Sequence, residues 1–285
     1  MKNSIRKDMA SGLATALVVF APLASNAQSE WLPDADTVIL WHLNEGSGST
    51  TADAAPVLGG SNNGTISPGD TIWTSSGRFG NGLLSTANYT TGYLGTTPIG
   101  SGLFAGQKFT LDAWIKPTSI DAAGGSYIMG FDDMIGGAAG AFFRLEPGGN
   151  NLRFAVFNVI SGFGYTQTDL LLNVGAGVNM LDGTWRHVAA TYDNQTMKIF
   201  LDGVELGSTT TQTYFQLAEP LRFTAAGSRG WNPDAADGYR YMGYIDEIRV
   251  SNIARTEFSV VPEPSAFALA GLGGLGLFWR LRRRV

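Results

Sequence analysis

The chain has no cysteine and only two histidines, His42 and His187, among its 285 residues. Disulfide bonds, iron–sulfur clusters, cysteine-ligated zinc and a thiol nucleophile are therefore excluded. Charged residues are also scarce, at 15%, whereas 44% of the residues are hydrophobic and 38 are glycine. This balance excludes a disordered chain, and the absence of a three-residue glycine repeat excludes collagen. The composition favours a globular protein of sheets and turns rather than helices.

Enzyme signatures are missing as well. Neither histidine lies in a zinc-protease motif, and no serine–histidine–aspartate arrangement is apparent. A retaining glycosidase needs two carboxyl groups about 5 Å apart, which alternate positions on one strand can provide. Asp246 and Glu247 are consecutive, so we expect them to point to opposite faces, and Asp202 and Glu205 flank a turn. We therefore predict that the protein is not an enzyme.

Residues 1–27 have the three parts of a secretory signal peptide. A basic start is followed by an apolar stretch over residues 10–24 and by small residues before a cut at Gln28. We expect the protein to be exported through the inner membrane, with residues 28–37 as a lead-in to the folded domain.

The C-terminus carries Pro262-Glu263-Pro264, an apolar run over residues 266–279 and a cluster of arginines. The run is short for a full membrane span, and the arginines would hold its end in the cytoplasm. In order and position these features resemble the PEP-CTERM sorting tail of Gram-negative bacteria that make exopolysaccharide.

The resemblance covers residues 261–285 and implies a short transmembrane segment. It also implies processing by an exosortase-type membrane peptidase that acts through Pro262, Glu263, Pro264 and the tail. Delivery to the cell surface, outer envelope or extracellular matrix would follow, with transient or stable membrane anchoring by the C-terminus. An ordinary C-terminal membrane anchor is the alternative.

The region between the two ends is acidic. Residues 28–260 contain twelve lysines and arginines against 22 aspartates and glutamates, a formal net charge of about −10. Such a surface repels nucleic acid and anionic lipid headgroups, so we expect no nucleic-acid partner. It is compatible with divalent cations or neutral glycans.

Alternating hydrophobic stretches between glycine, asparagine and aspartate turns predict one all-β domain. In the clearest strand, Phe109, Leu111, Ala113 and Ile115 share a face, and we expect Pro117 to end it. Residues 185–206 predict a hairpin with a turn at 193–196 and a second tight turn at Asp202-Gly203. We expect three tryptophans on predicted strands to lie in the core: Trp41, Trp114 and Trp185.

Six blocks resemble laminin-G-like, concanavalin A-like jelly-roll domains. They are Leu40–Gly48 with Ala52-Asp53, Arg78–Leu83, Phe109–Pro117, Gly183–Tyr192, Lys198–Gly203 and Gly243–Val250. The resemblance implies a two-sheet antiparallel jelly-roll sandwich over residues 38–255, with its first and last strands adjacent in one sheet.

The same resemblance implies a structural calcium site, because several laminin-G-like relatives hold Ca²⁺. The candidate ligands are Glu45, Asp53 and Asp246, which could meet where the first and last strands pair; otherwise they are ordinary loop and strand residues. Calcium takes six to eight oxygen ligands and requires neither cysteine nor histidine. Asn44 stands where the motif often has aspartate, so position 44 is a doubtful ligand.

Glycan recognition requires exposed aromatic rings beside polar groups. The segment 231–241 has that composition and carries loop signals, so we predict a ligand site at Trp231, Tyr239 and Tyr241. The alternative is that these rings fix a long loop to the sheet.

We therefore predict an exported cell-surface or matrix protein that acts as a non-catalytic binding or adhesion module, with exopolysaccharide or another glycan as its ligand. Two alternatives remain open. The first is a purely structural matrix component, and the second is a carbohydrate-active enzyme of the glycoside hydrolase type.

Overall fold

The computed structural model describes most of the predicted domain. The signal peptide, the C-terminal tail, Trp231 and Tyr239 lie outside the described residues. The described residues are 30–55, 62–66, 71–86, 94–96, 104, 106–122, 124–133, 139–160, 164–211, 221–226 and 240–258.

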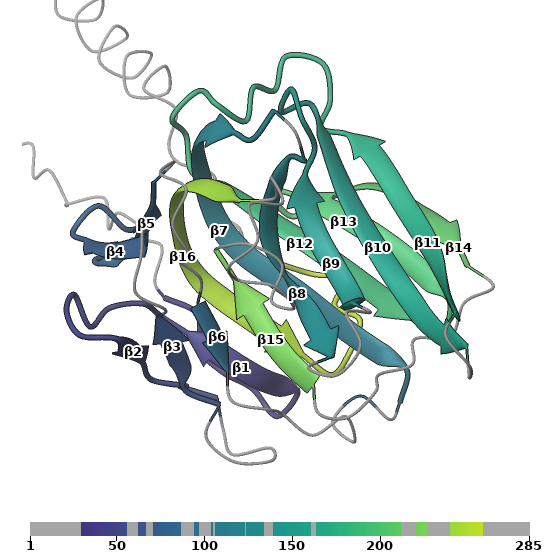
Figure 1. The fold of residues 1–285 in the computed structure, drawn as a ribbon, viewed down its shortest axis with the longest axis horizontal. Helices are drawn as coiled ribbons and strands as arrows, with labels where there is room; N and C mark the ends of the chain where they lie inside the picture. Colours follow the sequence, from purple (N-terminus) through teal and green to yellow (C-terminus); the bar gives the residue numbers. More distant parts are fainter. Residues whose placement is uncertain are drawn as a thin grey trace, which may run out of the picture.

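Two antiparallel sheets form a sandwich (Figure 1). Sheet A has the order β14-β13-β12-β7-β16-β5-β4, with β1 also paired to β16. Its strands are β1 (Thr37–Trp41), β4 (Thr71–Thr74), β5 (Gly82–Ser85), β7 (Lys108–Ile120), β12 (Arg186–Asp193), β13 (Thr196–Leu201), β14 (Val204–Thr210) and β16 (Tyr241–Ser251). The all-β jelly-roll class predicted from the sequence is confirmed.

Sheet B has the order β11-β10-β9-β8-β15-β6-β3-β2. Its strands are β2 (Thr50–Thr51), β3 (Gly64–Ile66), β6 (Leu94–Thr96), β8 (Ser126–Asp133), β9 (Ala139–Leu145), β10 (Asn151–Ile160), β11 (Gly164–Asn173) and β15 (Leu221–Ala225). In Figure 1 the long strands β8 to β11 lie in front of the sheet A strands β7, β12 and β13.

The last strand, β16, organises sheet A. One edge pairs with β7, while the other is shared by β5, at residues 243–245, and β1, at residues 248–251. The first and last strands are therefore adjacent, as expected from the sequence. This pairing brings residues more than 200 positions apart into contact.

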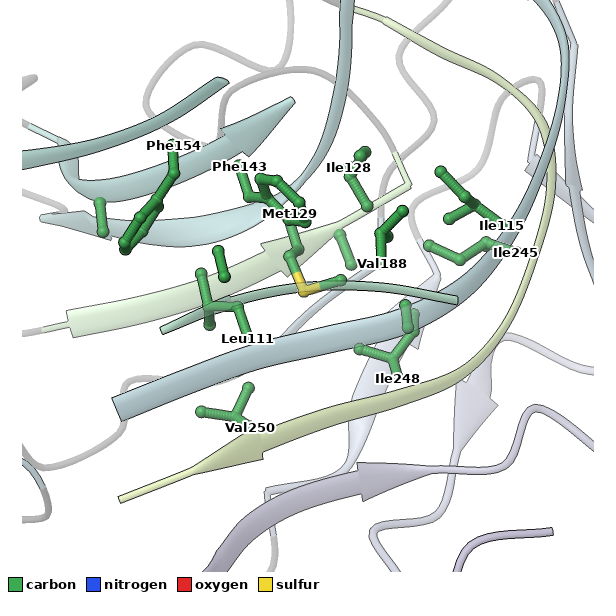
Figure 2. Packing of buried hydrophobic residues seen from close by; sticks show 14 of the residues in the cluster. Leu111, Ile115, Ile128, Met129, Phe143, Phe154, Val188, Ile245, Ile248 and Val250 are labelled. Atoms are coloured by element: carbon green, nitrogen blue, oxygen red, sulfur yellow. The ribbon is translucent and has the colours of Figure 1, made fainter. Parts of the chain in front are cut away.

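The core fills the space between the two sheets (Figure 2). Alternate residues of β7 point inward, and all four predicted side chains, Phe109, Leu111, Ala113 and Ile115, are fully buried. They meet the inner side chains of sheet B, including Phe143 of β9. The period-2 pattern in the sequence thus identified the inner face of β7 correctly.

The predicted hairpin is β12–β13, and its turn follows the expected chemistry. Asn194 and Gln195 both have positive φ values, 43° and 84°. A turn with two consecutive residues of positive φ has a backbone twist that matches the right-handed twist of the flanking strands.

The predicted end of β7 at Pro117 is wrong, because the strand runs on to Ile120. The register of β16 shifts between Met242 and Gly243, which lies opposite Pro117. Gly243 has φ 141°, and a Cβ there would lie 2.5 Å from the carbonyl oxygen of Lys116. Pro117 has no backbone N–H to donate to the neighbouring strand, and the irregularity in β16 allows the two strands to stay paired past it.

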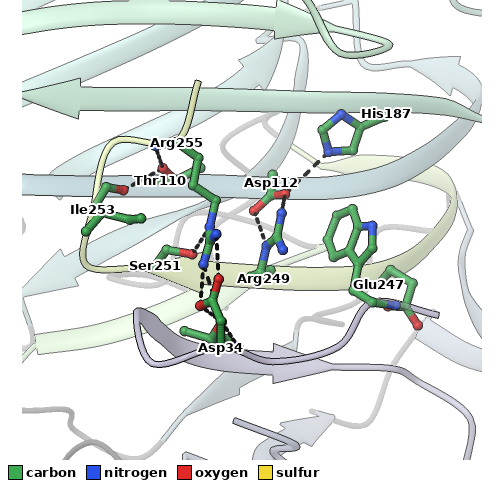
Figure 3. Close-up of polar contacts among 11 residues, drawn as sticks. Asp34, Thr110, Asp112, His187, Glu247, Arg249, Ser251, Ile253 and Arg255 are labelled. Carbon is green, nitrogen blue, oxygen red and sulfur yellow. Dashed lines mark hydrogen bonds and ion pairs between the residues drawn. The ribbon is translucent and has the colours of Figure 1, made fainter. Parts of the chain in front are cut away.

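A buried ionic network covers the middle of the outer side of sheet A (Figure 3). Arg249 donates from Nη2 to Asp112 Oδ2 at 2.7 Å and from Nε to Oδ1 at 3.2 Å, and His187 Nε2 lies 3.4 Å from Oδ2. Burial alone would raise the pKa of Asp112, but the charge of Arg249 and the hydrogen bonds from His187 and Arg249 hold that pKa below its usual value. The indole of Trp31 lies 4.3 Å from the Arg249 guanidinium and seals the network from water.

The two ends of the domain are joined beside this network. Arg255 donates two hydrogen bonds to the Asp34 carboxylate, at 2.7 and 2.8 Å (Figure 3). The Thr110 hydroxyl donates to the carbonyl of Ile253 at 2.6 Å and accepts from the Arg255 N–H at 2.8 Å. The residues before β1 and the residues after β16 are thus bonded to each other, and the latter are also bonded to β7 of sheet A.

We expect Asp112→Ala to lower the free energy of unfolding by about 3–5 kcal/mol, because it leaves the Arg249 guanidinium buried without its counter-charge. The matched control is Asp193→Ala, which removes an exposed ion pair with Lys108 and should cost less than about 1 kcal/mol. Urea unfolding of both variants measures the difference. Equal costs would contradict the central role assigned to the Asp112 network.

The same carboxylate gives a pH dependence of known sign. The pKa of Asp112 is lower in the folded chain than the ordinary 3.8, so its contribution to stability is complete above 3.8 and is lost as the pH falls from there through the lower folded pKa. We expect the stability difference between the wild type and Asp112→Asn to be constant above about pH 5 and to shrink below about pH 4. Unfolding curves of both proteins from pH 3 to 7 test this, and a difference that grows toward acid would contradict it.

Candidate functional site

A row of aromatic and aliphatic side chains crosses the outer side of sheet A. Tyr244 of β16 lies opposite Lys116 of β7 on one edge and Leu84 of β5 on the other, and Leu84 lies opposite Ile72 of β4. Trp185, directly before β12, continues the row beyond Lys116. Ile72 is 51% exposed and the other four are partly exposed, so the whole row is open to solvent.

The polar centre of this row is the ammonium group of Lys116. It lies 4.1 Å from the ring centroid of Tyr244 and 5.1 Å from that of Trp185. The two rings are 6.3 Å apart in an edge-to-face arrangement. Cation–π attraction holds the ammonium group against both rings, and that group carries three N–H donors. We call Trp185, Lys116 and Tyr244 the aromatic row.

The predicted core position of Trp185 is wrong, whereas Trp41 lies in the main core and Trp114 is 2% exposed. Trp114 packs with Trp31 and Leu40 in a separate cluster on the outer side of sheet A. Trp185 packs against this cluster but is only partly buried. Arg186 pairs with Ile115, so Trp185 stands opposite Lys116 on the outer side. The pattern of apolar residues in the sequence could not distinguish this exposed side from the inner one.

Sheet B also has aromatic side chains on its outer side, but they are closed to solvent. Tyr127, Phe142 and Phe157 are 3%, 4% and 2% exposed and form their own cluster with Ala155. They offer no open platform, so the aromatic row of sheet A is the better candidate among the described residues.

The predicted ligand site is not supported at its one described residue. Tyr241 is fully buried at the start of β16, and its hydroxyl donates to the carbonyl of Tyr244 at 2.6 Å. Tyr241 faces the core because it is an inward residue of a strand, not part of the preceding loop. Trp231 and Tyr239 lie outside the described residues.

The predicted calcium ligands do not meet. Glu45 Oε1 accepts from the backbone N–H of Ala52, and Asp53 accepts backbone N–H groups of Leu40, Ala55 and Asn62. Glu45, Asp53 and Asp246 form no common group among the residues that the structure describes. Each of these carboxylates accepts backbone N–H groups of a turn or loop, and the calcium site stays a prediction.

Asp246 and Glu247 do not point to opposite faces, contrary to the expectation. Glu247 has φ 48°, and two residues of β16 lie opposite Ala113 alone between the pairs Asp246–Trp114 and Arg249–Asp112. This bulge turns both carboxylates to the outer side of sheet A. Both residues are nevertheless fully buried, so neither can reach a substrate on the surface.

The two carboxylates accept hydrogen bonds from segments that cover the sheet. Asp246 Oδ2 accepts from the N–H groups of Arg78 and Phe79, and Glu247 Oε2 accepts from the N–H of Trp31. Burial raises the pKa of Asp246 to about 7, with the charge of Glu247 as a further cause. Burial likewise raises the pKa of Glu247.

Glu30, His42 and Glu247 form the one group of three potential metal ligands in the described ranges, with one ligand atom from each residue within 4.8 Å of the others. His42 Nδ1 lies 2.8 Å from Glu247 Oε1, and Glu30 Oε1 accepts from Asn44 Nδ2 at 2.7 Å. The hydrogen bond with Glu247 raises the pKa of His42. No sequence pattern indicates this group, because Glu30 and Glu247 are 217 positions apart.

Within the part of the chain that the structure describes, no helix is long and apolar enough to cross a membrane. The run at 266–279, predicted to do so, lies outside that part. Residues 260–284 match the PEP-CTERM protein-sorting motif, which confirms the predicted sorting tail. That signal indicates export and C-terminal processing or anchoring at the cell envelope.

Curated relatives match only a short stretch. Human and mouse pappalysin-1 are 26% and 25% identical to this chain over 93 residues, which is 32% of the chain and 5% of pappalysin-1. The chain therefore spans a very small part of the relatives it matches.

Solved structures support the fold. The binding domain of botulinum neurotoxin DC in complex with SialylT has a TM-score of 0.54 at 12% identity and covers 78% of this chain. The binding domain of Paraclostridial Mosquitocidal Protein 1 has a TM-score of 0.53 at 13% identity and covers 77%. Each match spans about half of the solved chain, 49% in both cases, and at such identities the likeness concerns the fold alone.

A family model provides the assignment. Residues 88–260, more than half of the chain, match Laminin_G_3 of the concanavalin A-like lectin/glucanases superfamily. The jelly-roll order of the sheets and the pairing of β1 with β16 agree with this match. The chain therefore belongs to the concanavalin A-like lectin/glucanases superfamily.

Proposed function

We propose that the protein is an exported, non-catalytic module that binds a polysaccharide outside the cell through the aromatic row of sheet A. The observation that carries the proposal is the contact of two partly exposed rings with each other and with one ammonium group. Sugar rings have apolar C–H faces that pack on aromatic rings and hydroxyl groups that accept from a lysine.

The length of the surface favours a chain of sugars over a single sugar. Beyond the aromatic row, Leu84 and Ile72 continue the outer surface, so that it runs from Trp185, directly before β12, across β7, β16 and β5 to β4. Four spacings of about 4.8 Å give a length of roughly 19 Å. A linear segment of several sugars fits this length, with Leu84 and Ile72 as its apolar end.

Two further observations support a binding role. The buried Asp246 and Glu247 offer no accessible carboxylate pair for glycoside hydrolysis. A solved relative of the same fold, from botulinum neurotoxin type C, has been described as dependent on interaction with two ganglioside molecules for cell entry. That dependence belongs to the toxin, of whose chain the match covers 49%, and for this chain it only motivates a test with glycans.

We expect Trp185→Ala and Tyr244→Ala each to weaken polysaccharide binding about tenfold, since an aromatic contact of about 1.5 kcal/mol corresponds to that factor. Affinity is measured with the purified full-length chain in mild detergent, against a panel that includes the producing cell's own exopolysaccharide. Leu171→Ala, which truncates an exposed side chain of sheet B, is the control and should bind normally.

Circular dichroism and unfolding of each variant show whether the fold is intact. Trp231→Ala tests the alternative site predicted from the sequence. Binding lost in Trp231→Ala but retained in both aromatic-row variants would reject the proposed surface. Failure of the wild type to bind any glycan in the panel would favour a structural matrix component.

The sorting motif gives an independent prediction. Replacing Pro262, Glu263 and Pro264 with alanine should prevent recognition by the processing peptidase, so an unprocessed precursor should accumulate in the producing cell. Mass spectrometry of the wild-type and variant chains from the envelope and medium measures the C-terminal end. An identical processed end in both chains would contradict exosortase-type processing through this motif.

A further inference from the structure

Three segments that are distant in sequence bring metal-binding side chains to one place on the outer side of sheet A. Glu30 belongs to the lead-in, His42 directly follows β1, and Glu247 occupies the bulge of β16. One ligand atom from each lies within 4.8 Å of the other two. Ligand atoms on a tetrahedral zinc ion with bonds of about 2.1 Å are about 3.4 Å apart, so the three side chains would have to close by up to about 1.4 Å around the ion.

The ligands are held by further hydrogen bonds. The N–H of Trp31 donates to Glu247 Oε2 at 3.0 Å, which leaves Oε1 directed at His42. Asn44 Nδ2 donates to Glu30, and Asn44 is itself bonded to Asn81, whose backbone N–H donates to Asn44 Oδ1 at 3.2 Å. Outer partners of this kind orient the ligands of protein metal sites.

The local charge favours a cation. Glu247 is fully buried and Glu30 adds a second carboxylate, whereas His42 is the one imidazole of the group. The guanidinium of Arg249 is committed to its two hydrogen bonds with Asp112. A divalent ion would offset this acidic excess, and would displace the hydrogen-bonded proton between His42 and Glu247.

We propose that Glu30, His42 and Glu247 bind a divalent transition-metal ion, with zinc as the preferred ion. Imidazole nitrogen with carboxylate oxygens is a donor set that suits zinc, whereas calcium takes oxygen ligands. Glu30 is exposed and the His42 side chain is 24% exposed, so the ion can enter from solvent. Three protein ligands leave a coordination position for water. The site is separate from the aromatic row and does not depend on glycan binding.

The test is a zinc titration of the full-length chain, purified in mild detergent without a histidine tag. Calorimetry should give one equivalent of bound zinc, and His42→Gln and Glu247→Gln should each weaken binding at least tenfold. The control Glu205→Gln changes an exposed carboxylate on β14 and should bind like the wild type. Calcium in large excess should not compete.

The two histidines give a residue-specific readout. Zinc should shift the imidazole NMR signals of His42 and leave those of the fully buried His187 unchanged. Should Glu247→Gln fail to fold, Glu30→Gln and His42→Gln, at the solvent side of the group, still decide the question. No zinc binding at millimolar concentration, unchanged affinity in His42→Gln, or a shift of His187 instead of His42 would overturn the proposal.

Discussion

The pairing of β16 within sheet A brings the two ends of the domain and the centre of the sheet together. One edge of β16 pairs with β7 and its other edge with β5 and β1, so the last strand joins the beginning, middle and end of the chain. Its inward residues Ile245, Ile248 and Val250 complete the core, as Figure 2 shows. Its outward residues form the polar contacts that hold the lead-in and the 77–81 turn against the sheet.

The outer side of sheet A is divided into a covered part and an open part. Trp31 and the attachment of Arg255 to Asp34 cover the middle, where the buried Asp112, His187 and Arg249 form their network. Beyond this cover, the row from Trp185 to Ile72 stays open. The cover therefore stabilises the domain and also limits where a ligand can bind. An aromatic surface on the open part is consistent with a binding module displayed outside the cell.

The sequence predicted the regular parts of this fold and missed the irregular ones. Alternation identified the inner side of β7, and the Asn194-Gln195 turn identified a hairpin, because both signals are local. The bulge at Glu247 and the irregularity opposite Pro117 depend on how β16 pairs with β7, which no local pattern encodes. The bulge changed the direction predicted for the Glu247 side chain. The irregularity in β16 allows β7 to continue past Pro117 to Ile120.

The candidate site was less predictable for the same reason. Trp185, Lys116 and Tyr244 come from three separate blocks, and only the strand register places them side by side. A tryptophan on a strand more often lies in the core than on the surface, so Trp185 was predicted to be buried. The ligand site was instead predicted in the loop before β16, because that segment is rich in aromatic and polar residues. Tyr241, chosen on that basis, belongs to the core.

The most direct test of the central claim is NMR mapping of the surface that contacts a polysaccharide fragment. The signals of Lys116, Trp185 and Tyr244, together with the indole N–H of Trp185, are followed while the fragment is added. We expect saturable shifts concentrated on these residues and extending toward Leu84 and Ile72. Saturable shifts confined to sheet B or to the loops, with the aromatic row unchanged, would contradict it.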